Sequence, residues 1–198
     1  MQNMTTLEKV SARVDELSKN CFDDLVPIED ISFDNLESVK IANEVHPMRP
    51  IAQQSIANRL CIPIQYLRKC PSELQAYNMN HWIKEEKNDE LFLRFDGEEV
   101  RAVFTPKYKP IDNFEVLERL DSLGYPPETP VQCHLDSEFM SLSILDGNKT
   151  FSINGDKMTP GISIANSEVG LACLSIAAFI LRLICTNGCI ATTEVKAS

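Results

Sequence analysis

The longest apolar run of the chain lies near its C-terminal end, and the other hydrophobic patterns lead up to it. In residues 171–185, LACLSIAAFILRLIC, only Ser175 and Arg182 are polar. A membrane-spanning helix needs about 20 apolar residues, so this run is too short to cross a membrane, and an arginine interrupts it. Asn187-Gly188 follows and favours a hairpin, because both residues tolerate positive φ. We therefore expect a strand over most of the run, buried on both faces, although its two adjacent alanines leave a helix open.

Upstream of this run, short apolar segments bounded by turn residues predict antiparallel strands. They occur at 91–95, 100–104, 131–145, 149–154 and 161–165. The Asp96-Gly97 pair between the first two predicts a hairpin, and residues 166–170 predict a turn before the long apolar run.

Helical spacing of apolar residues dominates the first half of the chain. It occurs at 5–17, 51–60, 64–70, 73–87 and 114–123. In the fourth of these helices the apolar residues are Leu74, Tyr77, Trp82 and Ile83. Asp112 or Asn113 is expected to cap the last helix, which Gly124 ends.

Together these elements predict an α+β fold in which N-terminal helices pack on a mainly antiparallel β-sheet. We expect residues 1–40 to form an acidic N-terminal helix or arm and residues 41–198 to form a single α+β domain. Within that domain we place the helical part at 41–90 and the sheet part at 91–198. Residues 1–40 hold nine acids and four bases, a balance typical of a solvated arm or of a helix that docks on another protein.

Charge and cysteine usage narrow the classes of partner and compartment. The 198-residue chain has a formal net charge of −10, which argues against sequence-independent binding to nucleic acid. The first residues, MQNMTTLEKV, lack the apolar segment of a signal peptide. The seven cysteines form no CxxC pair, so we expect free thiols in a cytoplasmic protein and no zinc site.

One window of the chain is basic against this acidic background. No acid occurs between Glu44 and Glu73. The bases inside the window are Arg49, Arg59, Arg68 and Lys69. The window also holds two predicted helices separated by a short turn, an order typical of a DNA-reading helix-turn-helix or of a plain helical hairpin. Cys61 stands where such a motif usually has glycine.

A second basic segment follows the predicted hairpin. Lys107 and Lys109 flank Tyr108, which could stack on a base while the lysines meet phosphates, or could pack the loop on the sheet. Arg101 and Arg182 lie in otherwise apolar strands. They could line a charged groove, or each could pair with an acid such as Asp112 or Glu168.

The sequence contains no catalytic signature. The three histidines have no nucleophile and carboxylate in a triad pattern. Asp136 and Glu138 would share one face of a strand and could join other carboxylates around Mg²⁺, but no spacing motif supports such a site. We therefore expect a non-enzymatic protein with no cofactor and no metal.

Three segments carry a resemblance to a known family. They are CIPIQYLR at 61–68 followed by NMNHW at 78–82, VRAVFTPKYKPIDN at 100–113, and GISIANSEVG at 161–170 continuing to RLICTNG at 182–188. In this order they resemble the phage- and plasmid-borne family called domain of unknown function 932, over roughly residues 45–190. The family often has Asp-Gly-Ser where this chain has Glu168-Val169-Gly170. Its members continue beyond the Asn-Gly turn, so this chain looks short at its C-terminus.

The resemblance implies a protein of a mobile genetic element, found among replication or recombination functions. A strand-annealing-like role follows only by analogy of fold. The polar positions within the matched motifs are Arg101, Tyr108, Asp112, Asn166, Ser167, Arg182 and Asn187.

Two functions from different classes remain open. The first is a nucleic-acid transaction factor that contacts single- or double-stranded nucleic acid through Arg49, Arg68, Lys69, Arg101, Lys107, Tyr108 and Lys109. The alternative is an interaction or inhibitor module that binds a host or element-encoded protein, since acidic proteins can mimic nucleic acid. A contiguous basic groove would favour the first function, and bases scattered among acids would favour the second. Self-association is compatible with either.

Overall fold

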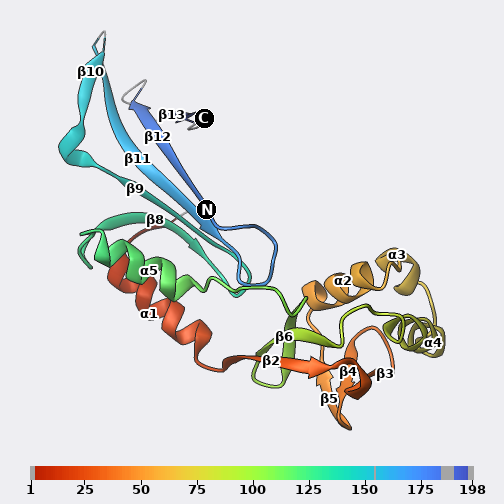
Figure 1. Cartoon of the computed structure of the whole chain (residues 1–198). Coiled ribbons are helices and arrows are strands. Elements are labelled where there is room, and N and C mark those ends of the chain that lie inside the picture. Colours follow the sequence, from red (N-terminus) through yellow and green to blue (C-terminus); the bar gives the residue numbers. More distant parts are fainter. Residues whose placement is uncertain (1–2, 154, 184–189, 196–198) are drawn as a thin grey trace. The chain divides into compact units, whose positions relative to one another are not determined.

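The computed structural model describes residues 3–153, 155–183 and 190–195 and shows an α+β protein with antiparallel sheets (Figure 1). The α+β class predicted from the sequence is confirmed. The chain divides into two compact units: unit 1 contains Met1–Leu17 and Ile111–Ser198, and unit 2 contains Ser18–Pro110. This division differs from the arm and single domain expected from the sequence, because the first helix packs into the core of unit 1.

Unit 1 is built on one seven-stranded sheet with the order β1-β8-β9-β11-β12-β13, in which β10 also pairs with β11. The strands are β1 (Asn3–Thr6), β8 (Pro130–Leu135), β9 (Met140–Leu145), β10 (Phe151–Ile153), β11 (Asp156–Asn166), β12 (Ser175–Leu183) and β13 (Ile190–Val195), with the short helix η2 (Gly147–Lys149) before β10. Every pairing in it is antiparallel. The 131–145 run is therefore two strands, and the strand expected at 161–165 is confirmed within β11.

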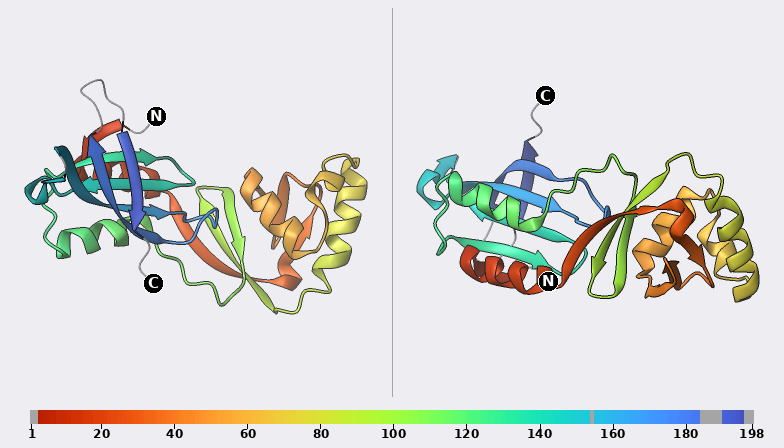
Figure 2. Two further views of the ribbon diagram at one scale, coloured as in Figure 1. Left: turned by 90° about the horizontal axis from the view of Figure 1, so that it is seen from above. Right: turned by 60° about the horizontal axis from the view of Figure 1, so that its bottom comes forward.

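Two helices cover one face of this sheet, α1 (Leu7–Ser18) and α5 (Asn113–Ser122) (Figure 2). Their apolar stripes are buried, with Val10 and Val14 on α1 and Val116 and Leu120 on α5. Alternate residues of β8, β9 and β11 complete the core. The cap predicted at the start of α5 is confirmed, because Asp112 is the N-cap and forms a capping box with Glu115.

The long apolar run is a strand, as predicted, but it is not buried on both faces. Within β12, Ile176 is 67 % exposed, and in the segment before it Leu171 is 57 % exposed. The helices pack on β8, β9 and β11. Among the described residues, nothing comparable packs on β12. The hairpin turn expected at Asn187-Gly188 lies outside the described residues.

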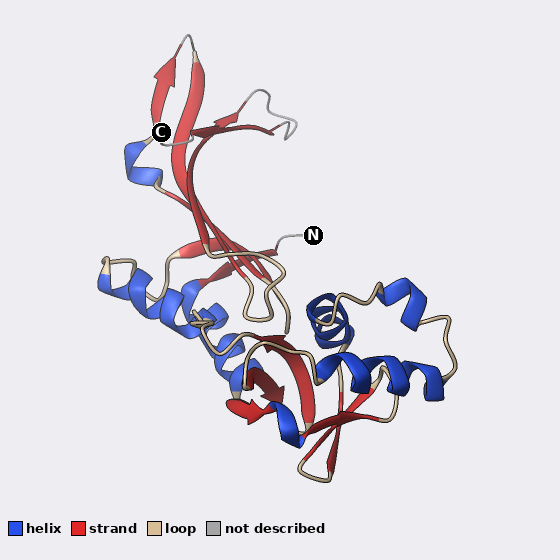
Figure 3. Ribbon diagram, turned by 45° about the vertical axis from the view of Figure 1, so that its right-hand side comes forward, coloured by secondary structure: helices blue, strands red, loops and turns tan. Residues whose placement is uncertain are grey.

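Unit 2 contains two three-stranded antiparallel sheets and three helices (Figure 3). One sheet has the order β2 (Cys21–Pro27), β6 (Glu90–Asp96), β7 (Glu99–Phe104), and the other has the order β3 (Ile31–Phe33), β4 (Ser38–Ile41), β5 (Glu44–Pro47). The helices are α2 (Pro50–Arg59), α3 (Ile64–Leu67) and α4 (Ser72–Ile83), and η1 (Ile28–Asp30) joins β2 to β3. The predicted β6–β7 hairpin is confirmed.

Amide side chains tie α4 to its neighbours in unit 2. The Asn80 side chain donates to the Phe33 carbonyl at 2.7 Å and accepts from the Phe33 N–H at 2.8 Å, as a neighbouring strand would. Gln75 accepts from the N–H of Leu36 and donates to the carbonyls of Leu67 and Cys70. The position of α4 is thus fixed by polar contacts as well as by the burial of Met79 and Ile83. No helix among the described residues is long and apolar enough to span a membrane.

Candidate functional site

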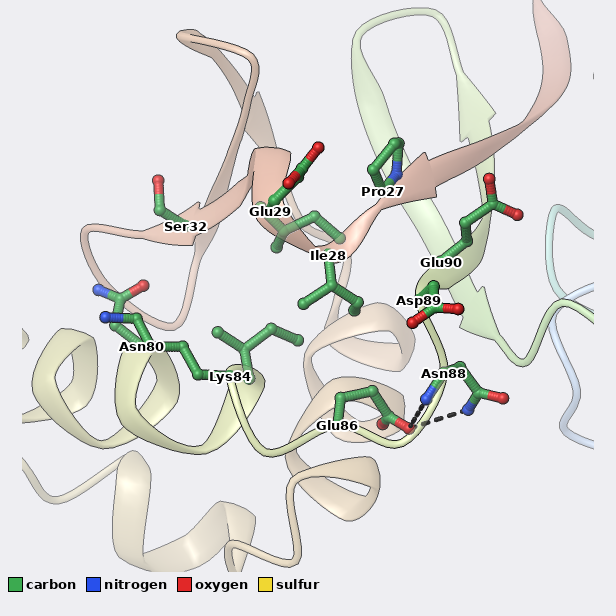
Figure 4. A pocket seen from close by; sticks show the side chains of 12 residues that line it. Pro27, Ile28, Glu29, Ser32, Asn80, Lys84, Glu86, Asn88, Asp89 and Glu90 are labelled. Carbon is green, nitrogen blue, oxygen red and sulfur yellow. Dashed lines mark hydrogen bonds between the residues drawn. The ribbon is translucent and has the colours of Figure 1, made fainter.

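A groove of about 940 Å³ lies on unit 2 (Figure 4). One wall comes from the end of β2, η1 and the start of β3, and the other from the end of α4 and the segment leading into β6. Its volume falls within the range of ligand pockets, roughly 300–1,000 Å³. A backbone hydrogen bond from Ile28 N–H to the Asp89 carbonyl, 2.9 Å long, joins the two walls.

The groove combines apolar side chains with an acidic rim. Ile28, Ile31 and Ile83 supply its apolar part. Three exposed carboxylates stand at the rim, Glu29, Asp89 and Glu90, and the structure shows no ion pair for any of them among the residues it describes. The Lys84 side chain extends toward Asn80 and away from Asp89 and Glu90 (Figure 4). The groove therefore has one strongly acidic end.

The fourth carboxylate of the groove, Glu86, already has hydrogen-bond partners within unit 2. Glu86 accepts from Nη1 of Arg59 at 3.3 Å and from the backbone and side-chain N–H groups of Asn88. Burial alone would raise the pKa of Glu86, but hydrogen bonds from Asn88 and Arg59 outweigh it and lower the pKa below its usual value. Glu86 is thus a charged structural group that links α2 to the segment after α4.

The outward side of α4 presents large apolar side chains. Leu74 is 40 % exposed, Tyr77 69 % and Trp82 47 %. The imidazole of His81 is parallel to the Tyr77 ring with centroids 6.3 Å apart, and it meets the Trp82 ring edge-on at 5.1 Å. We call these four side chains the α4 aromatic stripe. It shares its helix with the groove, which Asn80, Ile83 and Lys84 line.

Three residues proposed for nucleic-acid binding have other roles. Arg49 binds Asp96 at 2.6 Å and Glu99 at 2.9 Å, and these hydrogen bonds raise its pKa although burial opposes the charge. Arg101 is buried, with 4 % of its surface exposed. Tyr108 stacks on Phe104, with centroids 3.7 Å apart, and so packs its loop on β7.

The remaining basic candidates are exposed and follow two different elements of unit 2. Arg68 and Lys69 follow α3, whereas Lys107 and Lys109 follow β7. In the described part of the chain no ion pair involves any of these four side chains. The second helix of the proposed helix-turn-helix is α3, a single turn whose Ile64 and Leu67 are buried, although Cys61 does adopt the left-handed φ of 56° that the turn requires. None of these four bases lines the groove, whose rim is acidic.

Three of the polar motif residues, Asp112, Asn166 and Ser167, take part in one network of hydrogen bonds around the start of α5 in unit 1. Asn166 donates to the Ile111 carbonyl and to Oδ1 of Asn113, both at 2.9 Å. Glu168 accepts the Asn113 N–H at 2.7 Å, and the Asp112 N–H donates to Glu115 at 2.9 Å. Ser167 donates to the Glu138 carbonyl at 2.7 Å. These groups hold the start of α5 against the turn after β11 and are closed to a large ligand.

Two further expectations have a definite outcome. Arg182 is exposed and bonds Asp156 through Nε at 2.9 Å, so its acid partner is neither of those anticipated. Asn187 lies outside the described residues.

Asp136 and Glu138 are not on a strand, because they form the turn between β8 and β9, where Asp136 accepts the N–H groups of Glu138 and Phe139. No cluster of three or more His, Cys, Asp or Glu suited to a metal occurs in the described ranges.

Sequence reasoning singled out neither the carboxylates of the groove nor the stripe. The signal for the stripe was present: Leu74, Tyr77 and His81 fall on one helical face, and Met79 and Ile83 on another, so only the second pair is core. In comparisons with known proteins, no family model, no curated protein and no solved structure matches this chain. The resemblance to the domain of unknown function 932 therefore stays a prediction.

Proposed function

We propose that unit 2 is a protein-binding module that docks a partner through the α4 aromatic stripe. The observation that carries this proposal is the exposure of Tyr77 (69 %) and Trp82 (47 %) on a helix whose other face is buried. Leaving such side chains in water forgoes about 1.5–3 kcal/mol each of burial free energy. Tyrosine and tryptophan are enriched at protein interfaces and dominate their hot spots.

The charge distribution supports a protein partner over a polyanion. The chain carries a net charge of −10, and three of its carboxylates line the groove next to the stripe with no ion pair to any described residue. Phosphate backbones would be repelled there, whereas a basic protein surface would be attracted. This proposal corresponds to an interaction or inhibitor module acting on a host or element-encoded protein.

Site-specific crosslinking in cells that naturally make the protein tests the proposal. A photoreactive residue replaces Tyr77 in one variant and Val45, an exposed residue of β5, in the control. We expect one protein to crosslink at position 77 and not at position 45. Its affinity should then fall at least roughly tenfold for Tyr77→Ala plus Trp82→Ala, since hot spots contribute about 2 kcal/mol or more.

A second double variant, matched in exposure, shows whether the loss of affinity is specific to α4. Leu25→Ala plus Val45→Ala removes two side chains of similar exposure from strands of the same unit. Equal loss of affinity in both double variants, or crosslinking at position 45 alone, would contradict docking on α4.

A nucleic-acid transaction role is the second candidate function. The exposed pairs Arg68-Lys69 and Lys107-Lys109 favour it, because they remain available to phosphates. The test is titration with labelled single- and double-stranded DNA and RNA across a salt series. Binding that weakens steeply with salt and drops on Lys107→Ala plus Lys109→Ala would support this role. Absence of binding to every form at low salt would remove it.

A further inference from the structure

We propose that the groove holds a lysine or arginine side chain of the partner, so that the partner presents a basic segment beside the α4 aromatic stripe. This inference rests on the proposed function and adds the chemistry of the partner. The occupant follows from the shape and the charge of the groove together. Its inner surface carries Ile28, Ile31 and Ile83, and its rim carries Glu29, Asp89 and Glu90.

The apolar part of the groove suits the aliphatic stem of a long cationic side chain. Lysine and arginine bury their methylene groups along apolar surface while the charged end stays among polar groups. Ile28 is half-buried and is the most accessible of the three, and it packs on the core cluster that contains the almost fully buried Ile31 and Ile83, which hold it in place. A small inorganic cation would leave that apolar surface unused.

The carboxylates suit the charged end of the same side chain. Glu86 forms an ion pair with Arg59, but no ion pair to Glu29, Asp89 or Glu90 occurs among the residues described. In Figure 4, Asp89 and Glu90 project from one wall of the groove, and Lys84 points away from them. An ammonium or guanidinium group entering at this end therefore meets carboxylates without a competing cation, and guanidinium can bind one in a bidentate manner.

The groove adjoins the stripe on a single helix. Asn80 lines the groove, and Tyr77, one helical turn before it, belongs to the stripe. A bound segment could thus lay an apolar residue on Tyr77 and extend one basic side chain into the groove. Aromatic anchors surrounded by charged contacts are a common composition of protein interfaces.

The test is a titration of the isotopically labelled full chain with penta-arginine, followed by NMR. Penta-citrulline, which has the same shape without the charge, is the control ligand. We expect penta-arginine to shift the methyl signals of Ile28, Ile31 and Ile83 in a saturable way, and penta-citrulline to leave them unchanged. Asp89→Asn plus Glu90→Gln should weaken the binding of penta-arginine by roughly tenfold, because two carboxylate contacts are lost.

A charge-matched variant separates the groove from the general acidity of the protein. Glu44→Gln plus Glu98→Gln also removes two exposed acids of unit 2, but neither of them lines the groove. Its affinity for penta-arginine should stay within about twofold of the original chain, since distant charges are screened. Equal weakening in both double variants, or shifts spread over acidic side chains outside the groove, would overturn the assignment.

Failure of this inference is distinguishable from failure of the proposed function. If penta-arginine does not bind the groove but the crosslink at position 77 persists, the protein-binding role stands and the basic segment is excluded. If the groove binds penta-arginine and no protein crosslinks at position 77, the basic-ligand site stands without a role for the stripe.

Discussion

Buried polar side chains in unit 1 show how single residues can look functional and be structural. Asn166 and Ser167 stand out in the sequence as polar residues at the end of an apolar strand, and the structure buries both almost completely. Each hydrogen bond they make satisfies a backbone or side-chain group of the same unit. The sequence could identify these positions as special, but it could not supply their partners, which lie up to 55 residues away.

Replacing Asn166 with alanine should destabilise the protein by about 1–3 kcal/mol, the cost of leaving buried polar groups unsatisfied. The Ile111 carbonyl and Oδ1 of Asn113 would both lose their donor. Chemical denaturation of the full chain measures the change. Asn148→Ala, at an exposed amide of η2, is the matched control and should change the stability by less than about 0.5 kcal/mol. Equal effects of the two substitutions would contradict a buried role for Asn166.

Gly161 is a second residue whose role depends on contacts distant in sequence. A Cβ atom at this position would lie 2.6 Å from Cζ of Phe179 and 2.7 Å from the Ile144 carbonyl oxygen. Gly161→Ala should therefore cost about 1–3 kcal/mol through overpacking, measured by thermal or chemical unfolding. Adding Phe179→Leu should restore little of the loss, because the clash with the backbone oxygen on β9 remains. Full recovery in the double variant would show that the aromatic ring was the obstacle.

At the scale of elements, the type of an element was easier to predict than the face that it buries. Helix α4 and strand β12 both form where the hydrophobic pattern placed them, yet α4 exposes Tyr77 and Trp82, and β12 is not buried on both faces as expected. Burial depends on which neighbours cover an element, and a single-sequence pattern does not contain that information. Strands β4 and β5 escaped detection for a local reason. Their turn uses Ala42 and Asn43, with φ of 47° and 81°, instead of the usual Asn-Gly.

The pair of Arg59 and Glu86 gives unit 2 a pH dependence at its α2–α4 junction. The folded state lowers the pKa of Glu86 below the ordinary value of 4.5. Its contribution to stability is thus complete above the ordinary value and is lost as the pH falls through the lower folded value. We expect Glu86→Gln to be less stable than the original chain at pH 7, with the difference shrinking below about pH 4. Denaturant midpoints across this range provide the measurement, and a difference independent of pH would argue against the ion pair.

On the scale of the whole molecule, the sequence of unit 2 (18–110) is inserted between the two sequence segments that build unit 1 (1–17 and 111–198). Each unit has a separate hydrophobic core, one around α2, α4 and the β6–β7 hairpin and the other between α1, α5 and the large sheet. The proline-containing loop at 105–110 precedes the second boundary, but nothing in the sequence at residues 17–18 marks the first. Helix α1 reaches its partners through contacts with residues more than 100 positions later, which local patterns cannot foresee.

Separate cores predict that a core substitution in one unit leaves the other unit largely intact. Leu67 in unit 2 and Leu142 in unit 1 are both completely buried. Leu67→Ala and Leu142→Ala should each cost about 2–5 kcal/mol, because each leaves a cavity. Hydrogen exchange followed by mass spectrometry on the full chain should show faster exchange within residues 18–110 for Leu67→Ala, and within 3–17 and 111–166 for Leu142→Ala. If either substitution instead accelerates exchange equally across both units, the chain unfolds as one cooperative body. A binding module that can be transferred as residues 18–110 would then be ruled out.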